Sequence, residues 1–421
     1  MAGDRGVTRN RSQMKILTVD IGTGTQDIFL YDSRLDIENG FKLILPSPTM
    51  MIHRRVKKAI AAGSPILLTG HQMGGGPSAW AIQEAARAEV PVYMTPNAAM
   101  TLNDELEKVE ALGIRIISED EADGLSSTLA PGTSAGDVHR IELKDFDFPT
   151  ISRTFEDYGV PLDNLEAIAV AVFDHGNAPA GISDRQFRFD YLDERIRAKN
   201  SLSAFAYLST DIPKIMTRLQ SVADSARDLP CPLIVMDTAP AAVLGAEFDL
   251  TVATRKQKVI CNVGNFHTLA FRLGEKGIEG VFEHHTGEID RPKLESLLRR
   301  LADSSLKHED VFNDMGHGAL MYSQEKIELG KDEFDIVVTG PRRSMFRVLD
   351  PKPSTIDHGP WSLVHGHLRP YFATPFGDMM IAGCFGLLAA TADVLPNLAE
   401  VIQGSMRGAQ GYGVAPWDIS T

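Results

Sequence analysis

A glycine turn between two apolar stretches near the start of the chain constrains the fold more than any other feature. The segment LTVDIGTGTQDIFLYD covers residues 17–32, and the stretches on both sides of the turn have the character of β-strands. We therefore expect an antiparallel hairpin. A tight turn requires glycine where φ is positive, but it requires neither Asp20 directly before it nor two threonines within it. These additional polar groups indicate a loop that holds phosphate.

Two common phosphate loops do not fit this segment. A dinucleotide-binding G-x-G-x-x-G loop leads into a helix, whereas Gly24 is followed by the strand-like TQDIFLYD. A Walker loop requires Gly-Lys-Ser/Thr, which follows no glycine-rich turn in this sequence. In a third geometry, the N–H groups and threonine hydroxyls of a hairpin turn surround a phosphate, and the preceding aspartate holds the Mg²⁺ shell. The alternative is an ordinary hairpin turn.

Short apolar runs alternate with helical patterns through most of the chain, which predicts an α/β fold with buried sheets. The segment 120–148 is acidic and then rich in Gly, Ser and Thr, and we interpret it as an insertion or flexible loop. Expected strands cover residues 16–19, 28–31, 42–45, 66–68, 92–94, 115–117, 167–173, 233–236, 259–263, 269–273 and 336–338. Expected helices lie near residues 51–62, 78–88, 103–112, 212–227, 292–302 and 379–393.

The opening hairpin resembles the first phosphate element of the actin, sugar kinase and Hsp70-type ATPases, and four later segments resemble further elements of that superfamily. DTAPAAVLGAE (237–247) and FGDMMIAGCFGLLAA (376–390) resemble the two connecting helices, where small residues let the lobes cross closely. KVICNVGNFHTLAFRL (258–273) resembles the second phosphate loop, and FDIVVTGPRRSMF (334–346) resembles the adenosine element. All of these elements occur in the expected order over most of the chain.

This series predicts a two-lobed actin-like ATPase fold, which is a duplicated ribonuclease H-like fold. We expect a disordered tail at 1–13, a first lobe at 14–250 with an insertion near 120–148, and a second lobe at 251–421. The resemblance implies ATP and Mg²⁺ as cofactors, with Asp20 at the metal. It also implies nucleotide contacts from Gly22, Thr23, Gly24, Thr25, Gln26, Asn262, Gly264, Asn265, Gly340, Pro341 and Arg342.

Two elements depart from the pattern of the superfamily. The second phosphate loop has Asn262 where aspartate is usual, and Asn265 and Phe266 where glycine and threonine are usual. An amide can hydrogen-bond a metal-bound water or a phosphate, but it carries no charge for Mg²⁺. The adenosine element continues after Gly340 with Pro-Arg-Arg in place of a further glycine. An unusual nucleotide geometry, a different phosphorylated ligand and a lost activity are all compatible with these changes.

A closer resemblance is to an uncharacterised prokaryotic family that shares the DIGTGTQD start, LPSPT (45–49), a DTAPAA-type segment and EHHTG (283–287). Some of its members are labelled pyruvate formate-lyase activating enzymes. Such activators are radical enzymes whose iron–sulfur centre needs three clustered cysteines. Cys231, Cys261 and Cys384 stand singly and far apart, so we do not expect a radical enzyme.

Candidate catalytic residues lie where apolar strands end. Asp174 and His175 follow the run AIAVAVF, at the end of a strand where α/β sheets place ligands, and either side chain could act as a general base. Asp237 is the rival candidate. It also ends a strand, but it could equally serve as the N-cap of the following helix.

Several histidines and glycines leave alternatives open. His-Gly pairs recur in FDHGNAP, MGHGAL, IDHGP and VHGHL, and we interpret them as unconnected loop histidines; a metal site is the alternative, although HExxH is absent. The segment VFEHHTGEI (281–289) resembles a hairpin tip that either decorates the surface or contacts substrate. Three glycines, 74–76, precede Pro77 at an expected helix start, which is either an anion site or only a turn.

Composition limits the function classes. A formal net charge of −14 makes nucleic acid an improbable partner, and no run reaches the roughly 18 apolar residues of a membrane helix. Isolated cysteines fit a cytoplasmic location. We predict an enzyme, namely an Mg²⁺-dependent, ATP-binding phosphotransferase or ATPase that acts on a small molecule. The alternatives are an ATP-driven activator of a partner enzyme and a nucleotide- or metabolite-sensing protein without turnover, with homodimerisation left open.

Overall fold

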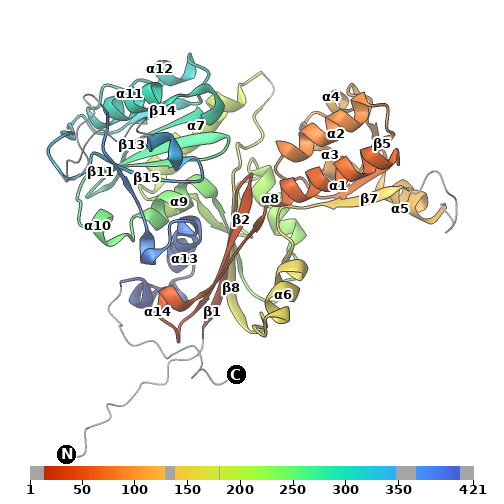
Figure 1. Cartoon of the computed structure of the whole chain (residues 1–421), viewed down its shortest axis with the longest axis horizontal. Coiled ribbons are helices and arrows are strands. Elements are labelled where there is room, and N and C mark those ends of the chain that lie inside the picture. Colours follow the sequence, from red (N-terminus) through yellow and green to blue (C-terminus); the bar gives the residue numbers. More distant parts are fainter. Residues whose placement is uncertain (1–13, 129–137, 180, 348–366, 408–421) are drawn as a thin grey trace, which may run out of the picture.

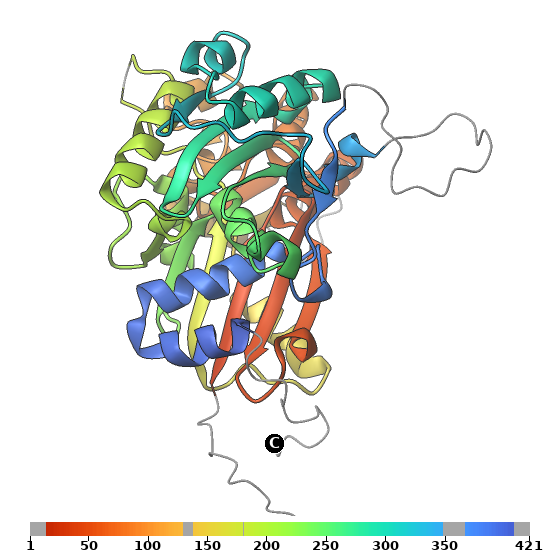
Figure 2. The same cartoon turned by 90° about the vertical axis from the view of Figure 1, so that its left-hand side faces the viewer.

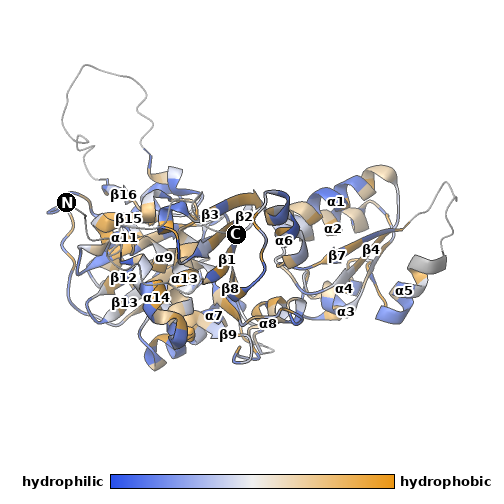
Figure 3. Cartoon of the chain, turned by 90° about the horizontal axis from the view of Figure 1, so that it is seen from below, coloured by the Kyte–Doolittle hydropathy of each residue, from blue (hydrophilic) through white to orange (hydrophobic). Residues whose placement is uncertain are grey.

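The computed structural model describes residues 14–128, 138–179, 181–347 and 367–407, so the expected disordered tail lies outside the described part of the chain. These residues form two six-stranded sheets and one four-stranded sheet. The two large sheets pack together, and the small sheet with its helices projects to one side of them (Figures 1 and 3). Among the described residues no helix is long and apolar enough to cross a membrane.

The first large sheet contains the predicted hairpin. β1, β2 and β3 form an antiparallel meander, and β8 and β10 continue the sheet parallel to β1. β1 and β8 are almost continuously buried, as expected for strands covered on both faces. In spatial order the strands are β3 (Phe41–Pro46), β2 (Thr25–Asp32), β1 (Lys15–Ile21), β8 (Leu165–Val172), β10 (Leu233–Asp237) and β9 (Ala206–Leu208).

The second large sheet repeats this arrangement. β11, β12 and β13 form an antiparallel meander, and β15 and β16 continue parallel to β11. In spatial order the strands are β14 (Gly318–Met321), β13 (Gly277–His285), β12 (His267–Gly274), β11 (Lys258–Val263), β15 (Ile336–Thr339) and β16 (Pro370–Phe372). A meander followed by two parallel strands, present twice in one chain, is the duplicated ribonuclease H-like topology. The predicted actin-like fold is therefore confirmed.

A separate α/β unit is inserted between β3 and β8. Its four strands are all parallel, in the order β6-β5-β4-β7. The segment near 120–148 lies within this larger unit, because it supplies α5 and β7, while residues 129–137 lie outside the described part. The lobe limits at 14–250 and 251–421 stay a prediction. The unit comprises α1 (Pro48–Ala62), β4 (Ile66–Gly70), α2 (Pro77–Arg87), β5 (Val92–Met94), α3 (Pro96–Ala99), α4 (Leu106–Glu110), β6 (Arg115–Ile116), α5 (Glu119–Thr128) and β7 (His139–Leu143).

The two predicted connecting helices, α9 (Thr238–Ala246) and α13 (Ala382–Val394), cross at backbone contact. A Cβ added to Gly245 would lie 1.7 Å from the Ala382 carbonyl oxygen, and one added to Gly386 would lie 1.8 Å from the Ala241 carbonyl oxygen. Only glycine fits at these two positions. With α14 (Pro396–Met406), α13 covers one face of the first sheet, although both helices follow the second sheet in sequence (Figure 2).

The remaining described helices lie outside the inserted unit. The α-helices are α6 (Phe148–Asp157), α7 (Asp184–Ala198), α8 (Thr217–Ser225), α10 (Leu250–Ala253), α11 (Arg291–Ala302) and α12 (His308–Phe312). The 3-10 helices are η1 (Ile37–Asn39), η2 (Leu202–Phe205), η3 (Thr286–Glu288), η4 (Arg343–Phe346) and η5 (Pro375–Gly377).

Candidate functional site

A cavity of about 640 Å³ lies where the two large sheets and the inserted unit meet. Its size falls within the roughly 300–1,000 Å³ typical of small-molecule sites. The ends of β1, β8, β11 and β15 all contribute to its wall, as in α/β sheets that bind ligands at the carboxyl ends of their strands. Predicted site residues that line it are Asp20, Gly22, Thr23, Gly24, Thr25, Asp174, His175, Asn262, Gly264, Asn265, Gly340 and Pro341.

The first glycine turn presents its polar groups to this cavity. The turn is closed by Gly22, whose N–H donates to the Thr25 carbonyl at 2.9 Å. Ser47 caps α1 and donates twice to the turn: its hydroxyl to the Thr23 carbonyl at 2.5 Å and its N–H to the Gly24 carbonyl at 3.2 Å. Ser47 thus fixes the conformation of the turn, whose residues Gly22 to Thr25 line the cavity.

The second glycine turn lies directly opposite the first. It is closed in the same way, with the Gly264 N–H donating to the His267 carbonyl at 3.0 Å. A Cβ added to Gly24 would lie 3.1 Å from Nδ2 of Asn265, so the two turns almost touch. The adenosine-like turn packs beside them: a Cβ on Gly340 would lie 2.5 Å from Oδ1 of Asn262. Three segments remote in sequence therefore meet at one place.

Two carboxylates face each other on the first hairpin. The strand register pairs Asp20 with Asp27, and both line the cavity. Burial raises the pKa of Asp20 to about 6, although the Thr238 hydroxyl donates to its Oδ1 at 2.6 Å. Burial and the charge of Asp20 raise the pKa of Asp27 to about 7, and Asp27 Oδ1 is buried without a hydrogen-bond partner in the described part of the chain. A paired set of oxygen ligands of this kind suits Mg²⁺.

Three predicted site residues lie away from the cavity wall. Gln26 is buried, and its Nε2 donates to the Pro46 carbonyl at 3.1 Å. The Arg342 N–H donates to the Val263 carbonyl at 2.9 Å, and the neighbouring Arg343 lines the cavity instead. Asp237 caps α9 by accepting the Ala239 N–H at 3.1 Å, which is the alternative role that its position suggested.

Asp174 lies on the wall, but its carboxylate also holds the surrounding loop. It accepts the N–H of Gly176 at 2.8 Å and the N–H of Leu219 at 2.9 Å. Burial raises the pKa of Asp174 despite these hydrogen bonds and the charge of Arg218. A carboxyl with a raised pKa in a cavity wall is suited to accept a proton.

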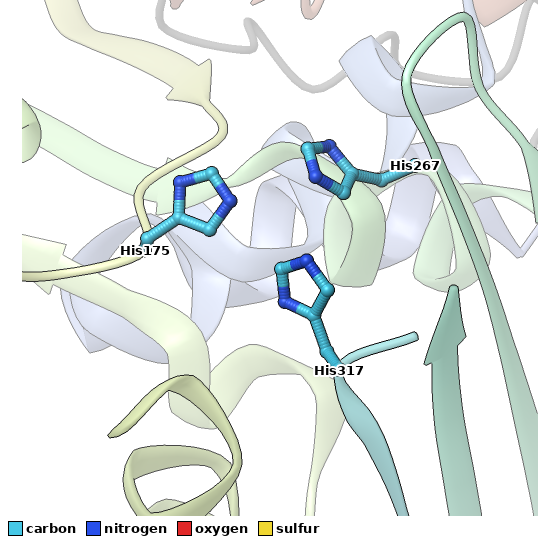
Figure 4. A group of neighbouring side chains, drawn as sticks. All are labelled: His175, His267 and His317. Atoms are coloured by element: carbon cyan, nitrogen blue, oxygen red, sulfur yellow. The ribbon is translucent and has the colours of Figure 1, made fainter. Parts of the chain in front are cut away.

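His175, His267 and His317 direct their rings toward one point (Figure 4). One nitrogen of each ring lies within 4.8 Å of the other two. Burial lowers the pKa of each ring, and nearby positive charges lower those of His175 and His317 further, so all three are neutral at pH 7. The interpretation as unconnected loop histidines is therefore wrong for His175 and His317. The histidines of IDHGP and the first of VHGHL lie outside the described residues.

A chain of buried charges lies behind these rings. Arg188 pairs with Asp237 at 2.5 Å and with Glu283 Oε2 at 3.2 Å, and Glu283 Oε1 lies 3.1 Å from His317 Nδ1. Glu283 and His284 are fully buried within β13. The predicted hairpin tip at 281–289 is therefore wrong, because β13 continues to His285, which lines the cavity.

The glycines before α2 also line the cavity, and the carboxylate of Asp145 accepts a hydrogen bond from one of them. The Gly74 N–H donates to both carboxylate oxygens of Asp145 at 3.2 Å, and Asp145 pairs with Arg218 at 2.7 Å. Gly76, with φ +65°, packs against the ring of Phe266 from the second turn. Both predicted roles, turn and anion site, remain compatible with this geometry.

The sequence interpretation did not include Asp27, His267 or Arg343 among the site residues. The register of the hairpin contains the signal for Asp27, since it follows from the length of the turn. For His267 the only sequence signal is its place in the second glycine turn.

Comparison with known proteins gives a family and remote structural neighbours. No curated protein matches the chain. A ROK hexokinase from Thermus thermophilus is similar at 11% identity over 63% of this chain and 48% of its own, with a TM-score of 0.21. This chain thus spans about half the length of the hexokinase. An exopolyphosphatase-like protein is similar at 10% identity over 78% of this chain and 66% of its own, with a TM-score of 0.24.

With scores this low, the fold assignment rests on the strand order of the two large sheets. A family model described as "Putative pyruvate format-lyase activating enzyme (DUF1786)" matches residues 73–345. The match covers well over half of the 421 residues. The three cysteines lie on separate parts of the fold: Cys231 before β10, Cys261 in β11 and Cys384 in α13. The chain belongs to this DUF1786 family.

Proposed function

We propose that the chain is an Mg²⁺-dependent, ATP-binding phosphotransferase or ATPase whose nucleotide site is the cavity between the two large sheets. The observation that carries the proposal is the approach of the two glycine turns, with Gly24 and Asn265 nearly in contact across the cavity. Two opposed turns can hold consecutive phosphates through backbone N–H groups.

Asp20 and Asp27 would hold the Mg²⁺ ion. The buried, unpartnered Oδ1 of Asp27 and the raised pKa values of both carboxyls fit a cation between them. Bound there, Mg²⁺ would neutralise phosphate charge. The amides and hydroxyls of the first turn would orient the phosphates, and Asp174 would accept the proton of the attacking hydroxyl or water. Asp237 takes no part, because its carboxylate is occupied by Arg188 and the cap of α9.

Two aromatic side chains would exclude water from the reaction. Trp80 of α2 packs edge-on against Phe266 of the second turn, with ring centroids 5.6 Å apart. This contact joins the inserted unit to the second glycine turn, where Phe266 lines the cavity. Loss of water strengthens electrostatic interactions at the phosphates.

Thermal unfolding with ATP, ADP and a non-hydrolysable ATP analogue, each with and without Mg²⁺, tests binding. A ligand at 100 times its Kd should stabilise the protein by roughly 2.7 kcal/mol. Gly24→Ala should weaken the effect, because its Cβ would fill the space between the turns. The matched control is Gly287→Ala, whose Cβ would meet no atom within 4 Å. No stabilisation by any nucleotide would refute the proposal.

Turnover needs a separate measurement, because an activator and a sensor would also bind ATP. Phosphate release by the wild type and by Asn262→Asp should be compared, with Asp20→Ala as the inactive control. We expect slow release by the wild type, since Asn262 carries no charge for the metal, and faster release by Asn262→Asp. Binding without release by either protein would favour the sensing alternative.

A further inference from the structure

The three converging histidines leave buried ring nitrogens without partners. Nε2 of His267 and Nε2 of His317 have no hydrogen-bond partner in the part of the chain that the structure describes, and His317 is only 1% exposed. Buried polar atoms in proteins are almost always satisfied, by protein, water or an ion. Because the three rings point at one another, a shared partner between them would satisfy these nitrogens together.

Glu283 lies beside one of the rings. Its Oε1 lies 3.1 Å from His317 Nδ1, although neither atom has a hydrogen-bond partner in the described part of the chain, and Arg188 holds its other oxygen at 3.2 Å. A proton on Nδ1 toward Glu283 leaves the Nε2 lone pair directed to the other histidines. A carboxylate behind a histidine is the usual support of a metal-bound imidazole, where it fixes the tautomer and the ring orientation.

The backbone and an aromatic ring hold the other parts of the cluster. Gly176 and Gly318 directly follow two of the histidines, with φ of +78° and +145°. A Cβ on Gly318 would lie 2.4 Å from the His308 ring, so the chain turns there only with glycine. Phe173 stacks on His267 with centroids 4.2 Å apart and planes inclined by 8°. The recurrent His-Gly pairs therefore have a structural reason at these two places.

We propose that His175, His267 and His317 bind a divalent transition metal of the Zn²⁺ class. Imidazole nitrogen suits Zn²⁺, Co²⁺ and Ni²⁺, whereas Mg²⁺ takes oxygen ligands. Three tetrahedral nitrogen ligands lie about 3.3 Å apart, so each ring has to move inward by at most about 1 Å from its position in the structure. Three protein ligands leave one position open toward the cavity, as in catalytic rather than structural zinc sites.

This site differs from the carboxylate pair in position and in chemistry. His175 follows β8 of the first sheet, whereas His267 and His317 belong to the second. A metal held by all three would connect the two sheets directly. The inference does not depend on nucleotide binding, because its side-chain ligands differ from Asp20 and Asp27, and His267 takes part in the second glycine turn only through its backbone carbonyl.

Titration of the EDTA-treated full chain with Co²⁺, in the absence of nucleotide, tests the site. We expect one equivalent to bind with the visible absorption of low-coordinate Co²⁺, and Zn²⁺ to displace it. His267→Ala should weaken binding at least 100-fold, while the matched control His139→Ala, on β7 of the inserted unit, should bind as the wild type does. An excess of Mg²⁺ should not compete.

Folding of each variant is checked by circular dichroism. If His267→Ala does not fold, His175→Gln replaces it with the same expected loss of metal binding. Glu283→Gln should still bind one equivalent of Co²⁺, but with an affinity about 10- to 100-fold lower, as expected of a positioning residue. Absence of saturable Co²⁺ and Zn²⁺ binding, or unchanged binding in folded His267→Ala and His175→Gln, would overturn the proposal. Neither of these two metal-binding results would refute the proposed nucleotide site, which is tested by thermal stabilisation with nucleotide and Mg²⁺.

Discussion

Replacement of Asp27 by asparagine should stabilise the metal-free protein, and increasingly so as the pH rises. Asp27 has a pKa raised from 3.8 to about 7 by burial and by Asp20, so its charged form opposes folding. A carboxyl whose pKa is higher in the folded state does not lower the free energy of unfolding at low pH, where it is protonated in both states. The cost develops as the pH rises from about 4 to about 7, and it is complete above pH 7.

The magnitude follows from the difference between the two pKa values. At 1.36 kcal/mol per pKa unit, the charged side chain costs up to about 4 kcal/mol at pH 8. Water entry and small rearrangements relieve part of this cost. We therefore expect Asp27→Asn to raise the free energy of unfolding by about 2 kcal/mol at pH 8. The increase should be clearly smaller at pH 5, where Asp27 is mostly protonated in the folded state.

Urea unfolding of both proteins at pH 5 and pH 8 in EDTA measures these differences. Addition of Mg²⁺ at pH 8 should stabilise the wild type and leave Asp27→Asn nearly unchanged, because the ion has lost a carboxylate ligand. A gain that is equal at the two pH values would refute the electrostatic reasoning. An equal response of the two proteins to Mg²⁺ would remove Asp27 from the metal site.

Two further substitutions test the parts of the fold that support the site. Gly245→Ala should cost about 3 kcal/mol or more in urea unfolding, since its Cβ would overlap the backbone of α13, while Gly287→Ala should cost less than about 0.5 kcal/mol. Arg188→Leu should cost roughly 3–5 kcal/mol, because it leaves Asp237 and Glu283 buried without their cation. If Arg188→Leu lowers the free energy of unfolding only slightly at pH 8, Asp237 and Glu283 become protonated in the variant and do not remain as buried charges.

The fold was predictable from the sequence where strands are long and apolar. The runs that became β1, β8, β10 and β11 bury almost every side chain, and no competing periodicity exists there. The strand β13 was not predicted, because GIEGVFEHH carries glycines and charged residues that resemble a turn. Its Glu283 is buried only because Arg188, 95 residues earlier in the chain, supplies a partner.

The sequence predicts some parts of the candidate site and not others, for the same reason. The glycine turns could be predicted because each is a local motif, and the pairing of Asp20 with Asp27 follows from hairpin register. The histidine cluster could not be predicted, since His175 follows β8 of the first sheet, whereas His267 begins β12 and His317 precedes β14 in the second. Only the tertiary fold brings them together, and their spacing in sequence carries no signature.

The two proposed metal sites respond differently to separation of the sheets. Both carboxylates of the Mg²⁺ site belong to one hairpin, so that site persists when the cavity opens. Asn262, on the opposite sheet, has no charge to add, and its side chain packs against Gly340. The histidine site takes ligands from both sheets, so it exists only while the cavity is closed. A Zn²⁺-class metal should therefore favour the closed form, whereas Mg²⁺ alone should not.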